Sequence, residues 1–270
     1  GTGVALVTPF TPQLAVDYQG LEKLLRHIAD SQVRYLVVHG TTGEAPTTTA
    51  EEKQEILAFV QAHNPKQLPI VYGLSGHDTQ AMLQSISTTA FQHVDAVMIT
   101  SPYYNRPSQE GIYSHYTALA DVCPVPVLKY TIPARTGSNM EAATTRRLSQ
   151  HPNIIGIKEA SGDLVQCTEI VLHTPEDFLV IAGDDMLTLP MIAIGAAGLI
   201  ATVGNSHAQD MSALVEAALQ GDFRTARQYM KTLMSPCKFI SQVGNPVGTK
   251  ELLAQVGICD PHVRPPLCCR

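Results

Sequence analysis

Short, almost unbroken apolar runs recur along the whole chain. Eight of them are expected to be β-strands, at residues 4–10, 35–40, 69–74, 96–100, 126–130, 154–160, 178–184 and 198–202. Between them lie segments whose apolar residues repeat with helical spacing, such as YQGLEKLLRHIADS and AEEKQEILAFVQAH. Because the runs are apolar rather than alternating, they are typical of parallel strands that helices cover on the outside.

Eight strand-then-helix units in succession predict an α/β protein, a (β/α)₈ or TIM barrel. A doubly wound sheet is the alternative, but the GxGxxG fingerprint expected after its first strand is absent. Helical patterns at 207–220, 222–235 and 246–257 exceed the one helix that completes a barrel. We therefore predict a barrel core at 1–206, with the last barrel helix and a C-terminal helical extension at 207–270, in a single domain overall.

The composition excludes several classes of partner. The 270 residues are 44% hydrophobic and 16% charged, and the net charge is −6 without a cluster of lysines or arginines, so nucleic acid is not expected to bind. No apolar run is long enough to cross a bilayer, and no signal-peptide pattern is present, so no membrane association is expected. The six cysteines lack CxxC spacing and HExxH is absent, which predicts no metal site and a cytoplasmic location.

Polar side chains gather where the predicted strands end. The active site of a barrel lies at the carboxyl ends of its strands. Five of these ends read HGTTGE, TSPYYNRPS, KYTIPARTG, KEASGD and AGDD. We expect one group of side chains to converge there: Lys158, Tyr130, Tyr103, Tyr104, Thr41 and Thr42.

Lys158 is the most unusual member of this group, because it ends an apolar strand. Strand alternation places it on the same side as Gly156, which we expect to leave it room. Apolar walls disfavour the charged ammonium and lower its pKa, and a neutral amine forms an imine with a ketone. The alternative is a strand-end lysine that reaches solvent and pairs with Glu159 or another neighbour.

Three further features carry chemistry of their own. The turn GTTGE offers hydroxyls and backbone N–H groups to a small anion such as a carboxylate, although a plain turn with an N-cap would read the same. Tyr130 has a phenol that can donate and accept a proton, or it is a core tyrosine. Arg135 could clamp a carboxylate in bidentate fashion, or lie in solvent.

The motifs GTTGE, SPYYNRPSQEG, KYTIPARTG, IIGIKEASGD and GDD occur in this order. With them the chain closely resembles the class I pyruvate-dependent aldolase family that includes dihydrodipicolinate synthase and N-acetylneuraminate lyase, from Gly3 to about Pro246. The resemblance implies a TIM barrel with a C-terminal helical extension and a homotetramer built from two tight dimers. It also implies catalysis without a cofactor, through a covalent lysine–pyruvate imine.

The resemblance also implies roles for individual residues. Lys158 would form the imine with pyruvate, and Tyr130 would be its proton donor and acceptor. Thr41 and Tyr104 would complete the proton relay, with Tyr104 reaching into the active site of the adjacent subunit. The implied substrate-binding positions are Thr42 for the pyruvate carboxylate, Arg135 for the carboxylate of L-aspartate 4-semialdehyde, and main-chain groups near Gly183 and Ile200.

Within the family, Thr42 and Arg135 favour a synthase. The implied reaction condenses pyruvate with L-aspartate 4-semialdehyde to 4-hydroxy-tetrahydrodipicolinate, on the route to diaminopimelate and lysine. One alternative is an aldolase or lyase that acts on another 2-oxo acid such as a sugar acid, which a substrate screen distinguishes. The other is a ligand-binding barrel without catalysis, against which the intact set of Lys158, Tyr130, Thr41 and Tyr104 argues.

The chain departs from the family pattern in two places. Thr131 replaces the asparagine that usually follows the strand-end tyrosine. At the positions of the allosteric lysine site, feedback-sensitive members have histidine, asparagine and glutamate, whereas this chain has Lys53, His77 and Ala81. A cation at the first position and the missing carboxylate at the third predict weak or absent inhibition by lysine.

Overall fold

The computed structural model describes residues 1–269 and is built around eight parallel strands. The strands are hydrogen-bonded in the order β1 to β8 and form a closed barrel. Their bounds are β1 (Thr2–Ala5), β2 (Tyr35–Val38), β3 (Ile70–Leu74), β4 (Ala96–Thr100), β5 (Val127–Thr131), β6 (Ile154–Glu159), β7 (Leu179–Ala182) and β8 (Gly198–Ala201). This confirms the (β/α)₈ barrel that the apolar runs predict.

Helices connect the strands and continue after the last one. The α-helices are α1 (Tyr18–Ala29), α2 (Ala50–Ala62), α3 (Thr79–Thr88), α4 (Gln109–Val122), α5 (Pro133–Thr136), α6 (Ala142–Leu148), α7 (Leu164–His173), α8 (Thr188–Ile194), α9 (Ala208–Leu219), α10 (Phe223–Val243) and α11 (Val247–Gln255). Three short 3₁₀ turns are η1 (Thr41–Gly43), η2 (Ala45–Thr47) and η3 (Val203–Asn205). The expected helical extension is therefore present as α10 and α11.

The chain forms two compact units. The first contains Gly1–Ile70 and the chain from Ile200 onward, and the second contains Val71–Leu199. The division at residue 206 that the sequence predicts stays a prediction. Among residues 1–269, no helix combines the length and the hydropathy needed to cross a membrane.

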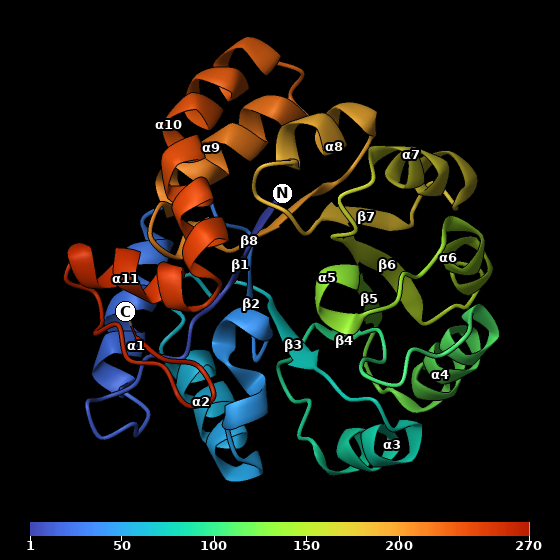
Figure 1. Ribbon diagram of the computed structural model, residues 1–270, viewed down its shortest axis with the longest axis horizontal. Coiled ribbons are helices and arrows are strands. Elements are labelled where there is room, and N and C mark those ends of the chain that lie inside the picture. The colour runs from blue at the N-terminus through green and yellow to red at the C-terminus, as the bar shows by residue number, and fades with distance from the viewer. Residues whose placement is uncertain (270) are drawn as a thin grey trace. The chain divides into compact units, whose positions relative to one another are not determined.

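In the first unit, α9 and α10 pack side by side (Figure 1). The buried residues of α10 follow helical spacing, at Ala226, Met230, Leu233, Cys237 and Ile240, so the helix presents one apolar stripe. This stripe explains why α10 continues to Val243, past the predicted end at residue 235. Pro236 removes one backbone hydrogen bond, but the residues buried on both of its sides outweigh that loss.

In the second unit, α4, α6 and α7 follow one another along the outside of β4–β7 (Figure 1). Most strand residues beneath them are buried and apolar, including the fully buried Val97, Ile99, Val127 and Ile157. The register pairs Tyr130 of β5 with Lys158 of β6. The two most reactive side chains that the sequence predicts are thus neighbours on adjacent strands.

Candidate active site

Lys158 lies one residue before the end of β6 and is 5% exposed. Its Nζ lies 4.4 Å from the centre of the Tyr130 ring. Burial lowers the pKa of Lys158 to about 8, Asp185 raises it, and Arg135 lowers it further. The amine is therefore neutral far more often at neutral pH than an exposed lysine is, which is what a nucleophilic amine requires.

Two glycines shape the surroundings of Lys158, but not as the sequence predicts. A Cβ at Gly156 would lie 2.4 Å from the Leu179 carbonyl oxygen, so Gly156 allows β7 to approach β6. A Cβ at Gly183 would lie 3.2 Å from the Lys158 Cε and 2.7 Å from the Ala160 Cβ. The prediction that Gly156 makes room for Lys158 is therefore wrong, and Gly183 has that role.

The side chain of Glu159 belongs to a hydrogen-bond network that does not include Lys158. Its carboxylate accepts hydrogen bonds from the Ser161 N–H at 2.6 Å and from Gln166 Nε2 at 3.1 Å. Gln166 Oε1 in turn accepts one from Asn139 Nδ2 at 2.6 Å. The alternative in which Lys158 reaches solvent and pairs with Glu159 is therefore wrong, and the network ties the loop after α5 to β6.

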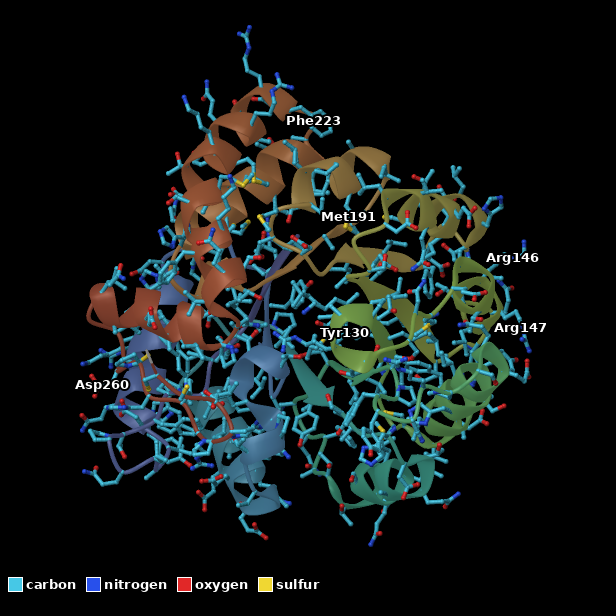
Figure 2. All side chains as sticks on the ribbon, in the orientation of Figure 1. Tyr130, Arg146, Arg147, Met191, Phe223 and Asp260 are labelled. Atoms are coloured by element: carbon cyan, nitrogen blue, oxygen red, sulfur yellow. The ribbon has the colours of Figure 1, made fainter. Side chains whose placement is uncertain are left out.

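Tyr130 is 3% exposed at the end of β5, just before the short helix α5 (Figure 2). Its carbonyl oxygen accepts hydrogen bonds from the Ser101 N–H at 2.9 Å and, more weakly, from the Tyr116 hydroxyl at 3.5 Å. Arg135 lies on α5 with an exposed side chain, and its charge acts on Lys158. The second unit thus brings Lys158, Tyr130, Arg135 and Gly183 into one neighbourhood.

Tyr104 stands apart from this buried group, because its side chain is 88% exposed. Its backbone has a φ of 75°, in the left-handed region that non-glycine residues rarely adopt. His77 lies close to both tyrosines of the loop, with ring centres 5.0 Å from Tyr103 and 6.5 Å from Tyr104. The loop therefore presents a large aromatic ring to the outside of this chain.

The first unit carries Thr41, Thr42 and Ile200. The turn η1 holds both threonines directly after β2, and the Thr42 side chain is buried. Thr42 Oγ1 accepts a hydrogen bond from Asn245 Nδ2 at 3.0 Å, and Asn245 Oδ1 accepts one from Thr249 Oγ1 at 3.1 Å. Ile200 is buried in β8. The side chain of Thr42 is thus linked to the start of α11.

A buried ion pair follows the same turn. Glu44 has a φ of 53° and accepts hydrogen bonds from Lys250 Nζ at 2.5 Å and from the Arg264 N–H at 3.0 Å. The Arg264 guanidinium binds both carboxylate oxygens of Glu52, at 2.6 and 2.7 Å. These contacts bind the C-terminal segment to the η1–η2 turns and give Glu44 a structural role.

Sequence reasoning missed some of these residues. Asn245 and Lys250 lie in no recognisable motif, and only the fold brings them to Thr42 and Glu44. In the GDD motif, Asp184 and Asp185 have different environments. Asp184 Oδ1 accepts hydrogen bonds from the backbone N–H groups of Met186 at 2.8 Å and Leu187 at 3.3 Å, whereas the charge of Asp185 acts on Lys158.

No group of three or more histidines, cysteines and carboxylates within residues 1–269 is arranged to hold a metal ion. The chemistry that this neighbourhood can perform with its own side chains is that of a buried amine beside a phenol.

Comparison with known proteins assigns the family. The sequence pattern of the Dihydrodipicolinate synthetase family matches residues 1–269. The chain belongs to this family. The 4-hydroxy-tetrahydrodipicolinate synthase of Cytophaga hutchinsonii is 46% identical over 267 residues, which are 99% of this chain and 90% of the relative. That of Flavobacterium psychrophilum is 42% identical over 268 residues, covering 99% and 92%.

Solved structures of the family have the same fold. The 4-hydroxy-tetrahydrodipicolinate synthase of Methylacidiphilum fumariolicum SolV has a TM-score of 0.96 at 36% identity, covering 100% of this chain and 90% of that chain. The dihydrodipicolinate synthase of Acinetobacter baumannii, solved in complex with pyruvate, has a TM-score of 0.96 at 31% identity, covering 100% and 92%. The family resemblance carried by the motifs is therefore confirmed over the whole length of the chain.

Proposed function

We propose that this protein is a 4-hydroxy-tetrahydrodipicolinate synthase, a lyase of the class I aldolase type that condenses pyruvate with L-aspartate 4-semialdehyde. The observation that carries the proposal is the buried Lys158 against the Tyr130 ring, with a pKa lowered to about 8. At that pKa about a tenth of the amine is neutral at pH 7, against about one part in three thousand for an exposed lysine. Family membership and the names of the relatives support the same activity.

The reaction begins on Lys158. Its neutral amine adds to the C2 carbonyl of pyruvate, and the resulting carbinolamine loses water to give an imine. Loss of a proton from C3 gives an enamine, which attacks the aldehyde carbon of the semialdehyde, and the new alkoxide takes up a proton. The amino group of the bound aldehyde then attacks the imine carbon, closes the ring and releases the Lys158 amine. The imine itself serves as electron sink, so no external cofactor takes part.

The proposal assigns proton transfer or substrate binding to each of the remaining site residues. Tyr130 donates and accepts the proton of the carbinolamine, with Thr41 and Tyr104 completing the relay. Thr42 holds the pyruvate carboxylate, and main-chain groups near Gly183 and Ile200 line the pyruvate site.

Arg135 would bind the carboxylate of the aldehyde. Its exposed guanidinium near Lys158 suits a carboxylate that arrives from solvent after pyruvate has reacted. We expect Arg135→Gln to raise the KM for L-aspartate 4-semialdehyde while the pyruvate imine still forms. An unchanged KM for the aldehyde would remove Arg135 from the site and reopen the choice of aldehyde.

The proposal extends to the assembly and the compartment. A homotetramer of two tight dimers would cover the exposed ring of Tyr104 and carry it to the adjacent active site. The four buried cysteines and the two exposed ones are all free thiols, which suits the reducing cytoplasm.

Sodium borohydride trapping with pyruvate tests the proposal. Reduction adds hydride to C2 of the imine and fixes pyruvate on the amine, which intact mass and peptide mapping then locate. We expect the adduct on Lys158, none in Lys158→Ala, and an unchanged adduct in Lys129→Met. Lys129 is the matched control because it is also buried with a lowered pKa, yet bonds to the Thr145 carbonyl oxygen at 3.2 Å. Folded protein without an adduct in excess pyruvate would refute the proposed function.

A further inference from the structure

The hydroxyl of Thr42 has a single proton. Whether it can donate this proton to a substrate depends on the hydrogen bonds that the hydroxyl makes within the protein. A threonine hydroxyl can donate one hydrogen bond and accept others. To hold a carboxylate, which only accepts, Thr42 must donate its proton to that carboxylate. Any neighbour that took this proton would turn the oxygen lone pairs toward the substrate instead, and two sets of lone pairs repel.

Asn245 decides the direction of this proton. Its Nδ2 donates to Thr42 Oγ1 at 3.0 Å, which occupies a lone pair and leaves the Thr42 proton to point elsewhere. An amide turned by 180° would offer its oxygen to Thr42 and take the proton. The orientation of the Asn245 amide is therefore the deciding variable.

Thr249 fixes that orientation. Its hydroxyl is fully buried in the first turn of α11 and donates to Asn245 Oδ1 at 3.1 Å. With the oxygen of the amide held by Thr249, the NH₂ group faces Thr42. The result is a directed chain of hydrogen bonds, from the Thr249 hydroxyl through the Asn245 amide to the Thr42 oxygen.

Residues that follow Thr42 and Thr249 in the sequence hold the two ends of this hydrogen-bond chain in place. Glu44, two residues after Thr42, is bound by Lys250, the residue after Thr249, at 2.5 Å. The Gly43 carbonyl oxygen accepts the Thr8 hydroxyl at 2.7 Å, and a Cβ at Gly43 would lie 3.1 Å from the Leu6 carbonyl oxygen. The turn that carries Thr42 therefore cannot shift easily relative to α11.

We propose that Asn245 is a positioning residue for pyruvate, which aims the Thr42 hydroxyl proton at the substrate carboxylate under the control of Thr249. This inference rests on the proposed function, because it takes Thr42 as the group that binds the carboxylate. It assigns a task in the pyruvate site to the link between α10 and α11, within the C-terminal helical extension.

The test compares imine formation with a charged and a neutral ketone. Borohydride trapping over a range of pyruvate and of methyl pyruvate concentrations gives the half-saturating concentration of each, by intact mass. Asn245→Asp keeps the shape of the side chain but replaces the donating NH₂ group with an accepting oxygen, which takes the Thr42 proton. We expect the half-saturating concentration of pyruvate to rise by about tenfold or more, and that of methyl pyruvate by less than about threefold.

Two further variants complete the design. Thr249→Val removes the hydroxyl that holds the amide, and we expect a rise of about two- to fivefold for pyruvate only. It also carries the test if Asn245→Asp does not fold. Thr48→Val removes another buried hydroxyl of the same region, which bonds only to the Ala45 carbonyl oxygen at 3.1 Å, and should shift neither ketone.

The outcomes separate the inference from the function on which it rests. No wild-type adduct with pyruvate would refute the proposed function itself. A normal wild-type adduct, with Asn245→Asp and Thr249→Val unchanged or equally weakened for both ketones, would overturn the role of Asn245 and leave the proposed function standing. Selective loss of pyruvate affinity in Thr249→Val as well as in Asn245→Asp would support it, because Thr249→Val adds no charge.

Discussion

The burial of Lys158 lowers the stability of the folded protein and makes the amine more nucleophilic. Its amine is buried with a pKa lowered to about 8, so keeping it protonated in the folded state at pH 7 costs free energy. We expect Lys158→Met to abolish the pyruvate adduct and to raise the free energy of unfolding at pH 7 by about 1–3 kcal/mol. Chemical denaturation of both proteins measures the gain.

The pH dependence of that gain has a definite sign. Between the folded pKa of about 8 and the ordinary value of 10.5, the unfolded chain binds a proton at Lys158 that the folded chain does not. The stability of the wild type therefore rises with pH relative to the variant across this window. The advantage of Lys158→Met should be complete below pH 8 and gone near pH 10.5. An advantage that grows with pH would contradict the burial argument.

The response to lysine depends on two other positions. Lys53 is half-buried with a pKa lowered by burial. The family resemblance implies histidine at this position in feedback-sensitive members, and glutamate where this chain has Ala81. We expect millimolar L-lysine to leave initial rates of this enzyme unchanged, because nothing at Ala81 attracts an ammonium group. The double variant Lys53→His, Ala81→Glu should gain inhibition, and strong inhibition of the wild type would contradict the prediction.

Individual residues were predictable from sequence to different degrees. Lys158 could be found because a lysine at the tip of an apolar run is rare, and Tyr130 because its strand lies next along the chain. The role of Gly156 was predicted wrongly, because the approach of two strands depends on register, which sequence alone does not give. Asn245 could not be found at all, since its partner Thr42 is 203 residues away.

The helix α11 illustrates what a single element contributes. Its Lys250 makes a fully buried ion pair with Glu44 and also donates to the His262 carbonyl oxygen at 2.7 Å. We expect Lys250→Met to lower the free energy of unfolding by about 3–5 kcal/mol, because it leaves a buried carboxylate without its cation. The double variant Glu44→Gln, Lys250→Met should lose clearly less.

Denaturant titration of the four proteins in this cycle measures the coupling between Glu44 and Lys250. Lys23→Met, at an exposed position of α1, is the matched control and should change stability by less than about 0.5 kcal/mol. Equal losses in the single and double variants would mean that Glu44 needs no cation.

Elements as a whole were easier to predict than single contacts. All eight strands were found because parallel strands buried on both faces read as apolar runs. The bounds were less exact: β1 begins at Thr2 and ends at Ala5, because the apolar residues after it are buried outside any strand. The length of α10 was underestimated because Pro236 is a local signal, whereas the stripe that overrides it is a tertiary one.

At the scale of the whole molecule, the exposed ring of Tyr104 raises the question of which subunit uses it. If Tyr104 acts in the neighbouring site, a mixed dimer of Lys158→Ala and Tyr104→Phe subunits has one intact site. Co-expression of these two inactive chains should then restore about a quarter of the wild-type activity, since half of randomly formed dimers are mixed.

Co-expression of Lys158→Ala with Tyr130→Phe is the control, because both residues belong to the same subunit's site and every combination leaves each site damaged. Activity in this control, or none in the Tyr104 mixture, would contradict the exchange of Tyr104 between subunits.

The hydrogen bonds of Glu44 also bear on the order in which the protein can fold during its synthesis on the ribosome. The turn after β2 emerges early, but Lys250 and the Arg264 N–H, its partners, follow 206 and 220 residues later. Synthesis proceeds from the N-terminus, so the Glu44 carboxylate cannot be paired and buried until these two partners have been made. A chain that stops before Asn245 would contain Lys158 but would lack the hydrogen bonds that hold Thr42 and Glu44. The buried ion pair of Glu44 can therefore form only after the chain has been made through Arg264.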